Sequence, residues 1–226
     1  MGLINRTIAV LLRGVAHLFL AGEVRSLHMA LRDLSTGHGA MVVETLPSIL
    51  CQALVAAEDH RFYSHSGLDL VAVARAIWQR VLRGRIQGAS TVEQQLTRTI
   101  RGRYERTLSR KLSEVLLAST VGEAFSKPHI LRIYLTVAHF GWRMQGASRA
   151  CAILGLDLTS LAPPQAASLV ARLKYPEPPE PDPVWEARVR RRGHHILCLV
   201  SNGRGKLPGS FIGAKLDATI SALDKG

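Results

Sequence analysis

The amino-acid sequence predicts a mainly α protein. Apolar residues recur at helical spacing in one segment after another, and no series of alternating apolar and polar residues indicates a sheet. No internal repeat divides the chain. With 226 residues, of which 47% are apolar, the chain is long enough for one large domain with a sizeable core.

The expected helices are separated by capping residues, glycine and proline. After an apolar segment at residues 8–21, the spacing predicts helices over residues 47–57, 69–84, 91–100, 107–121, 128–136, 163–173 and 184–200. Pro47 suits a first helical turn, Asp69 is expected to cap the next helix, and Ser160 is the expected cap of the helix at 163. Residues 174–183 hold five prolines and three acids, so we expect an extended surface connector there.

The N-terminal segment allows two interpretations. On a helix, Arg6, Arg13 and His17 fall on one stripe of an otherwise apolar surface. This pattern is typical of an amphipathic helix on a membrane surface or a weak membrane anchor, and also of a core-packed helix with one solvated stripe. We therefore expect an N-terminal segment at 1–22, a main domain at 40–203 and a C-terminal tail at 204–226.

The net charge of +12 indicates an anionic partner, which leaves nucleic acid, a lipid headgroup surface or a phosphorylated substrate. Only 5% of the residues are aromatic and no basic-aromatic nucleic-acid motif occurs, so nucleic acid is disfavoured. The three cysteines, Cys51, Cys151 and Cys198, have no metal-ligand or redox spacing, and we expect them to be buried small side chains.

The chain is organised around residues 57–69, where an apolar helix leads directly into Glu58 and Asp59. Two carboxylates at such a place are costly to desolvate unless they are paired or used. Burial would move a carboxyl group toward general acid or base work. The alternative is a helix end whose acids pair with Arg61.

Two further motifs suit an anionic group. Small residues at 88–89 followed by Ser90 and Thr91 stand at a helix start, where backbone amides bind anions, and Gln94 and Gln95 add donors one turn later. In the segment 106–114, three cations surround Glu114, an arrangement that can hold a diphosphate. The alternatives are an ordinary helix cap and a solvated, salt-bridged helix face.

Together these motifs resemble the peptidoglycan glycosyltransferases, glycosyltransferase family 51. This family includes the transglycosylase module of class A penicillin-binding proteins and the monofunctional transglycosylases. The resemblance covers residues 46–200 in the family order. It rests on Glu58, Asp59, Phe62, His65, Gly67 and Asp69, then Gly88, Ala89, Ser90, Thr91, Gln94 and Gln95, then Arg110, Lys111 and Glu114, then Lys127, Ile130, Leu131, Tyr134, Leu135 and Gly141, and finally the stretch 147–176.

The resemblance implies a lysozyme-like fold with two lobes around a cleft, and a reaction that joins lipid II to a glycan chain on undecaprenyl diphosphate. Glu58 and Glu114 are the implied catalytic residues, with Glu58 as the general base. The implied substrate-binding residues are Asp59, Phe62, His65, Ser90, Thr91, Gln94, Gln95, Arg98, Arg106, Arg110 and Lys111. A divalent cation, magnesium or manganese, is compatible with the diphosphate, although no ligand spacing indicates a metal site.

The sequence departs from the family pattern at Glu93, Arg98-Thr99, Arg132, Thr136 and Gln165. Glu93 is the most consequential, because it places a negative charge beside the expected diphosphate site. We expect it to weaken donor binding unless it turns to Arg98 or Arg101.

The expected location is the periplasmic face of the inner membrane, with the membrane surface and other cell wall synthases as partners and no nucleic acid. Because neither Ser-x-x-Lys nor Lys-Thr-Gly occurs, we expect a monofunctional enzyme without a transpeptidase domain. The alternatives are a lysozyme-like glycan hydrolase and a non-catalytic relative that binds lipid II or regulates a synthase.

Overall fold

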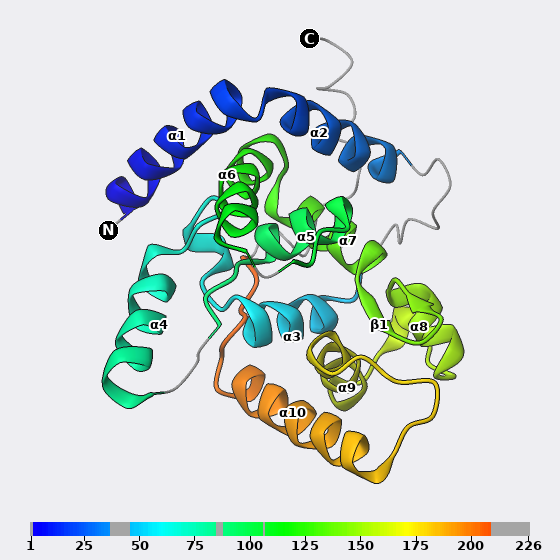
Figure 1. Ribbon diagram of the computed structural model, residues 1–226. Coiled ribbons are helices and arrows are strands. Elements are labelled where there is room, and N and C mark those ends of the chain that lie inside the picture. Colours follow the sequence, from blue (N-terminus) through cyan, green and yellow to red (C-terminus); the bar gives the residue numbers. More distant parts are fainter. Residues whose placement is uncertain (1, 37–45, 85–87, 106, 209–226) are drawn as a thin grey trace.

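A computed structural model describes residues 2–36, 46–84, 88–105 and 107–208, with side chains from residue 7 onward. The expected ligand Arg106, the side chain of Arg6, the start of the expected domain at 40 and most of the tail lie outside these residues. The helices are α1 (Gly2–Phe19), α2 (Ala21–Ser35), α3 (Ser48–Glu58), α4 (Leu70–Arg83), α5 (Val92–Arg101), α6 (Leu108–Ala124), α7 (Lys127–Val137), α8 (Ala147–Ile153), α9 (Pro163–Lys174) and α10 (Pro183–Ser201). The predicted mainly α fold is confirmed (Figure 1).

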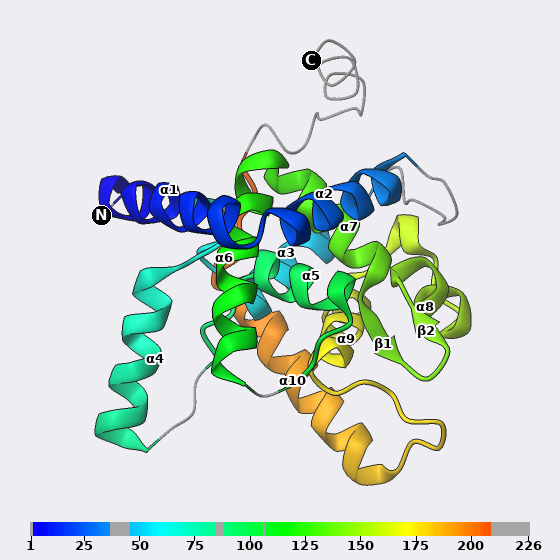
Figure 2. The same ribbon diagram turned by 45° about the horizontal axis from the view of Figure 1, so that its top comes forward.

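The core forms where α3 meets α9 and α10 on one side and where α5 packs with α6 and α7 on the other (Figure 1). Helix α3 is buried along most of its length because its sequence is apolar nearly all round, as expected for a central helix. This burial brings its C-terminal residue, Glu58, to the middle of the molecule. Helix α4 projects to one side (Figures 1 and 2).

Helix ends agree well with the predictions because local side chains determine them. The carboxylate of Asp69 accepts the Val71 N–H and caps α4, and the hydroxyls of Thr91 and Thr107 cap α5 and α6. Ser160 was the wrong cap for α9, since its hydroxyl donates instead to Asp157. Helix α9 begins after Ala162, whose N–H is bound by the side chain of Gln165.

The sequence reasoning missed several short elements. The hairpin of β1 (His139–Gly141) and β2 (Met144–Gln145) is too short to show an alternating pattern, and α8 is only seven residues long. Short 3-10 turns occupy Phe62–Ser64 and Leu158–Ser160. Of the three cysteines, Cys198 is exposed on α10, which corrects the expectation that all are buried.

The N-terminal segment forms two helices rather than one. Helix α1 lies across α6 and meets α2 at a sharp bend (Figure 2). Small residues form the contact, since Ala9 and Ala16 are buried, and Arg13 pairs with Glu123 of α6 at 2.8 Å. Among the described residues, no single helix meets the length and hydropathy expected of a membrane span, whereas residues 7–19 and 21–35, bent by 106°, meet them only together.

The outward face of α1 is apolar. Val10, Leu11, Val15, Leu18 and Phe19 are all exposed, with Leu18 at 74% and Phe19 at 73%. The expectation of a solvated basic stripe is therefore corrected at Arg13, which is directed toward α6 and retains only 18% side-chain exposure.

Candidate active site

Glu58 ends α3 with both carboxylate oxygens hydrogen-bonded. Arg192 of α10 lies 3.2 Å from Oε1, and the amide nitrogen of Gln95 in α5 donates to Oε2 at 3.1 Å. The Tyr134 hydroxyl donates to the amide oxygen of Gln95 at 2.8 Å, so the nitrogen of this amide faces Glu58. The side chain of Glu58 retains 18% exposure and stays reachable from solvent.

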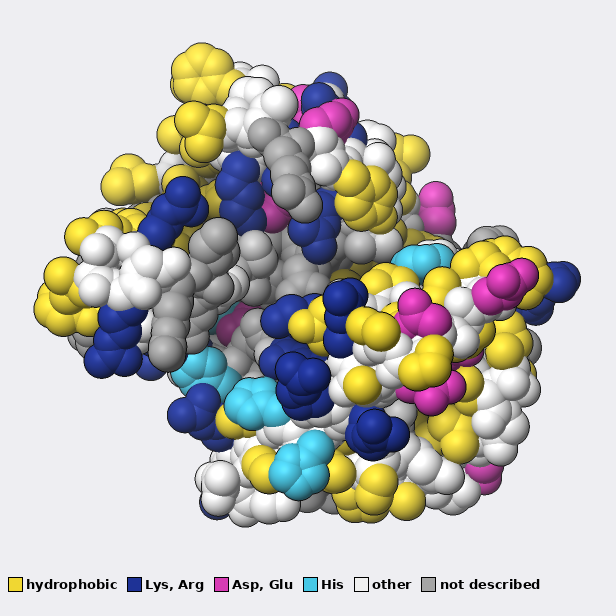
Figure 3. Space-filling view, turned by 60° about the horizontal axis from the view of Figure 1, so that its bottom comes forward, with side chains coloured by type: hydrophobic (Ala, Val, Ile, Leu, Met, Phe, Trp, Pro, Cys, Tyr) yellow, Lys and Arg dark blue, Asp and Glu magenta, His cyan; other side chains and the backbone are white. Residues whose placement is uncertain are grey.

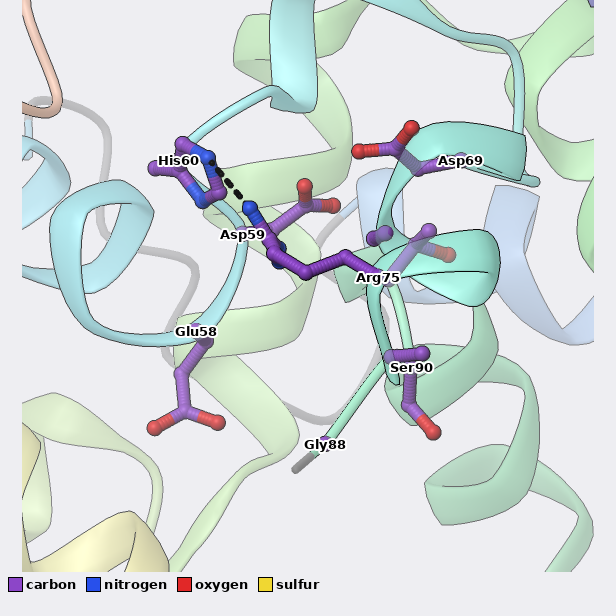
Figure 4. Close-up of a pocket in the computed structure, with 10 residues that line it drawn as sticks. Glu58, Asp59, His60, Asp69, Arg75, Gly88 and Ser90 are labelled. Atoms are coloured by element: carbon purple, nitrogen blue, oxygen red, sulfur yellow. Dashed lines mark hydrogen bonds between the residues drawn. The ribbon is translucent and has the colours of Figure 1, made fainter. Parts of the chain in front are cut away.

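The neighbouring carboxylate points elsewhere. Figure 4 shows Asp59 directed toward Asp69, while Glu58 extends in the opposite direction. Asp59 is buried and accepts the Val92 N–H at the start of α5 and the Nε2–H of His65, each at 3.1 Å. Asp59 and His65 therefore connect the segment after α3 to α5 inside the fold.

Arg61 does not pair with the Glu58-Asp59 end of α3. Its guanidinium donates to Asp69 at 3.1 Å, beside the Val71 N–H that the same carboxylate accepts. The alternative expectation for this motif, in which both acids are neutralised by Arg61, is wrong. This leaves Glu58 with Arg192 as its ion-pair partner.

Within the described ranges, one group of side chains has the spacing of metal ligands: Asp59, His65 and Asp69. Its carboxylate oxygens already accept hydrogen bonds from His65, two backbone amides and the cation Arg61. A further cation there would face the Arg61 charge and displace these donors. The donor set therefore fits a structural hydrogen-bond network rather than a metal site.

The Gly67 carbonyl joins this segment to α5, since it accepts the Thr91 hydroxyl at 2.9 Å and the Gln94 amide at 3.1 Å. Gly67 has φ +89°, and a Cβ atom there would lie 2.3 Å from the carbonyl oxygen of Ala118. Only glycine fits such a close approach at this backbone angle. Within the motif at residues 57–69, Gly67 is therefore required for the close packing against the backbone of Ala118.

A cluster of cationic side chains lies beside the start of α5. The Lys111 ammonium contacts Ser90 Oγ at 2.9 Å, Gln94 Oε1 at 2.7 Å and Glu114 Oε1 at 2.5 Å. Arg110 pairs with the second oxygen of Glu114, whose side chain is buried. Lys111 keeps 39% side-chain exposure, so this ordered cation faces solvent.

The first turn of α5 links the carboxylate to the cation cluster. Gln95 contacts Glu58, while its neighbour Gln94 contacts Lys111. Both contacts depend on side-chain amides that are themselves fixed by Tyr134 and Gly67. A partly exposed carboxylate and a cation cluster are thus held by consecutive residues of one helix.

The remaining expected ligands divide by exposure. Phe62 has no exposed surface and packs in the core beneath the Lys127 ammonium, 4.1 Å from the ring centroid. Thr91 and His65 are likewise buried, and substrate binding by these three residues stays a prediction. Arg98 is half-buried, with its guanidinium 5.9 Å from the Tyr104 ring centroid, and its Nε has no hydrogen-bond partner within the described part of the chain.

Glu93 does not face the expected diphosphate site. It is fully buried and pairs with Lys127 of α7 at 2.5 Å. The proposed partners Arg98 and Arg101 are also wrong, because Arg101 pairs with Glu23 of α2. The side chain points inward because Val92 and Leu96, on either side of it, are both buried in the core.

The other departures from the family pattern have local partners. Arg132 donates to the imidazole Nδ1 of His129, and Thr136 donates to the Arg132 carbonyl. Gln165 caps α9. None of these three hydrogen bonds involves Glu58 or the Lys111 cluster.

One face of the molecule has a hollow with Lys and Arg side chains around it and His side chains near its edge (Figure 3). A cavity is lined by Glu58, Asp59, His60, Asp69, Ala72, Arg75 and the residues 88–91. Burial and the adjacent Arg75 lower the pKa of His60, which fits its role as acceptor of an Arg75 hydrogen bond at 3.3 Å. The cationic rim suits an anionic ligand.

Sequence reasoning did not select Arg192, which stands outside the motifs. In the sequence it stands beside Arg188, Arg190 and Arg191 and looks like one more residue of a basic helix face. A usable signal is its spacing from Val189 and Ile196, which are buried on α10 and place Arg192 near the packed face.

The transglycosylase family model matches residues 29–200 of the chain. Penicillin-binding protein 1A of Neisseria flavescens is 38% identical over 157 residues, which cover 69% of this chain and 20% of the relative. The protein of the same name from Aquifex aeolicus (strain VF5) is 36% identical over 163 residues, or 71% of this chain and 22% of the relative. The chain thus spans about one fifth of the length of these relatives.

Proposed function

This chain belongs to the transglycosylase family, and we propose that it is a peptidoglycan glycosyltransferase that polymerises lipid II into β-1,4-linked glycan strands. The proposed donor is a glycan chain on undecaprenyl diphosphate. The observation that carries the proposal is the first turn of α5, whose Gln95 holds Glu58 while Gln94 holds Lys111. A base and a cation cluster at such a junction suit a reaction in which a diphosphate leaves.

Glu58 is the proposed general base. It lies 3.2 Å from Arg192 and retains exposed surface from which it can take the proton of the acceptor 4-hydroxyl. The acceptor oxygen then bonds to the anomeric carbon of the donor as the bond to the diphosphate oxygen breaks. Displacement in one step inverts the anomeric centre, which accounts for the β linkage.

The leaving diphosphate is the proposed ligand of Arg110 and Lys111, with Arg98 and Arg106 contributing further positive charge. Glu114 contacts Arg110 and Lys111 and orients them from below. Lys111 donates to Ser90 Oγ at 2.9 Å, and phosphate oxygens are stronger acceptors that can take the place of this hydroxyl. We further propose that magnesium or manganese would share the charge of the diphosphate.

The proposed location is the membrane surface on the periplasmic side. We propose that the protein acts there either alone or together with other cell wall synthases. The apolar outer face of α1 supports an in-plane contact with lipid, because it lies opposite the face that packs on α6. The activity is proposed for this chain as it stands, without a transpeptidase step.

Incubating the purified chain with labelled lipid II tests the proposal directly. Polymer is the expected product, and Glu58→Gln should reduce its formation at least ~10²-fold, the lower end of what a general base contributes. Glu180→Gln, at an exposed position in the connector, is the matched control and should leave the rate unchanged. Binding without turnover would support a non-catalytic relative, and cleavage of finished glycan would support a hydrolase. Chelation of divalent cations in the same assay tests the metal requirement.

A further inference from the structure

Arg192 connects the C-terminal helix to the proposed base. Its Nη2 atom lies 2.9 Å from the Ala57 carbonyl oxygen and 3.2 Å from Oε1 of Glu58. We propose that Arg192 is a positioning residue, which holds the Glu58 carboxylate in its ionised form and in the orientation needed to accept a proton. This inference rests on the proposed function.

The fold directs Arg192 inward while its basic neighbours face solvent. Arg190 and Arg191 are exposed, whereas the Arg192 side chain is 17% exposed. Helix α10 packs against both α9 and α3, and Gly193, the next residue after Arg192, is buried in its contact with the Ser168 backbone of α9. This arrangement brings the guanidinium to the end of α3, so the contact follows from helix packing.

Arg192 and Gln95 hold the carboxylate from two sides. Arg192 acts on Oε1 with a full charge, and Gln95 acts on Oε2 as a neutral donor. A carboxylate held at both oxygens has one orientation, and an arginine in contact favours its ionised form. Loss of Arg192 should therefore change both the rate and its pH dependence.

Other titratable groups around Glu58 would not substitute for this charge. The Tyr134 hydroxyl donates to Gln95, and burial together with the nearby Glu58 charge raises its pKa well above the ordinary value. In the cavity beside Glu58, Asp59 and Asp69 are anionic partners of other groups, and His60 accepts a hydrogen bond from Arg75. The charge of Arg98 opposes the upward shift of the Tyr134 pKa, and among the described residues Arg98 forms no hydrogen bond or ion pair with Glu58.

The test compares Arg192→Met, Arg192→Lys and the exposed control Arg191→Met in polymerisation assays from pH 5 to pH 9. Arg192→Met should lower kcat about 10-fold or more and move the acid limb of the pH profile upward by about one unit. Arg192→Lys should keep the wild-type acid limb while losing part of kcat, because it retains the charge without the planar fork. Arg191→Met should match the wild type in both.

A helix-capping role at Ala57 alone gives a different result. In that case Arg192→Met would lower the melting temperature and leave the pH profile of the remaining activity unchanged, which would overturn the inference. Carboxyl NMR of labelled glutamate, with Glu58→Gln to assign the signal, measures the Glu58 titration without turnover. An upward shift in Arg192→Met supports the contact even if lipid II is not polymerised, and an unshifted midpoint contradicts it.

Discussion

The Lys127 ammonium lies 2.5 Å from Oε1 of Glu93, and the carboxylate is fully buried. The same ammonium lies over the ring of Phe62, so the pair joins α5 and α7 to the segment after α3. Glu93 departs from the family pattern, and its position shows that the added charge is neutralised inside the fold. The expected repulsion of a diphosphate is therefore wrong.

Glu93→Thr should destabilise the protein and leave donor affinity unchanged. Removing one partner of a buried ion pair costs about 3–5 kcal/mol, because the other charge remains unpaired. Urea unfolding measures this loss, and Glu180→Thr at an exposed site is the control. The double variant Glu93→Leu with Lys127→Met should recover most of the lost free energy of unfolding, since neither charge remains.

A second measurement completes this test: the polymerisation rate is recorded against donor concentration at two ionic strengths. Glu93→Thr should follow the wild-type curve after correction for folded fraction, at low and at high salt. A several-fold gain in donor affinity that appears only at low salt would show that Glu93 acts on the diphosphate after all.

Acid should destabilise the packing of α2 on α7 through His129. Burial and the adjacent Arg132 lower the pKa of His129 to about 4, and its ring contacts Ser35 of α2 at 2.7 Å. The folded state keeps this imidazole neutral, while the unfolded chain takes up a proton below about pH 6.5. Its contribution to stability is therefore complete above pH 6.5 and is lost as pH falls toward 4.

The free energy of unfolding of the wild type should fall by about 1–3 kcal/mol between pH 6.5 and pH 4 from this group. His129→Gln should show a shallower decrease over the same range in urea titrations. His139→Gln, at an exposed position, serves as the control. Parallel curves for the wild type and His129→Gln would rule out this origin of acid sensitivity.

Membrane binding should depend on the outer face of α1. Leu11→Glu combined with Leu18→Glu should weaken binding to vesicles with anionic lipid at least ~10-fold, since each leucine that enters the bilayer contributes about 1.5–3 kcal/mol. Ile153→Glu, an exposed apolar position on α8, should bind like the wild type. Point substitutions are preferable to removal of residues 1–22, because Ala16 belongs to the core.

Circular dichroism of each α1 variant controls for folding. Equal vesicle binding by the wild type and the doubly substituted protein at matched salt would show that lipid does not cover this face. That result would contradict the proposed contact between α1 and lipid. It would leave the proposed glycosyltransferase activity, measured in detergent, unaffected.

The sequence by itself determined the helical architecture and most helix starts. Asp69, Thr91 and Thr107 cap helices through bonds to amides two or three residues away, so local sequence contains the whole interaction. Local sequence also indicated Glu58 and the Lys111–Glu114 cluster as chemically special. The resemblance to a family supported this choice through the order of the motifs.

Only the tertiary structure decided which charges meet. Glu93 pairs with Lys127, 34 residues away, and Glu58 meets Arg192, 134 residues away. Such pairs depend on how α5, α7, α3 and α10 pack, and periodicity within one helix cannot specify the partner across an interface. An ion pair between distant segments is strong only where packing removes water from both charges, and this condition belongs to the folded molecule.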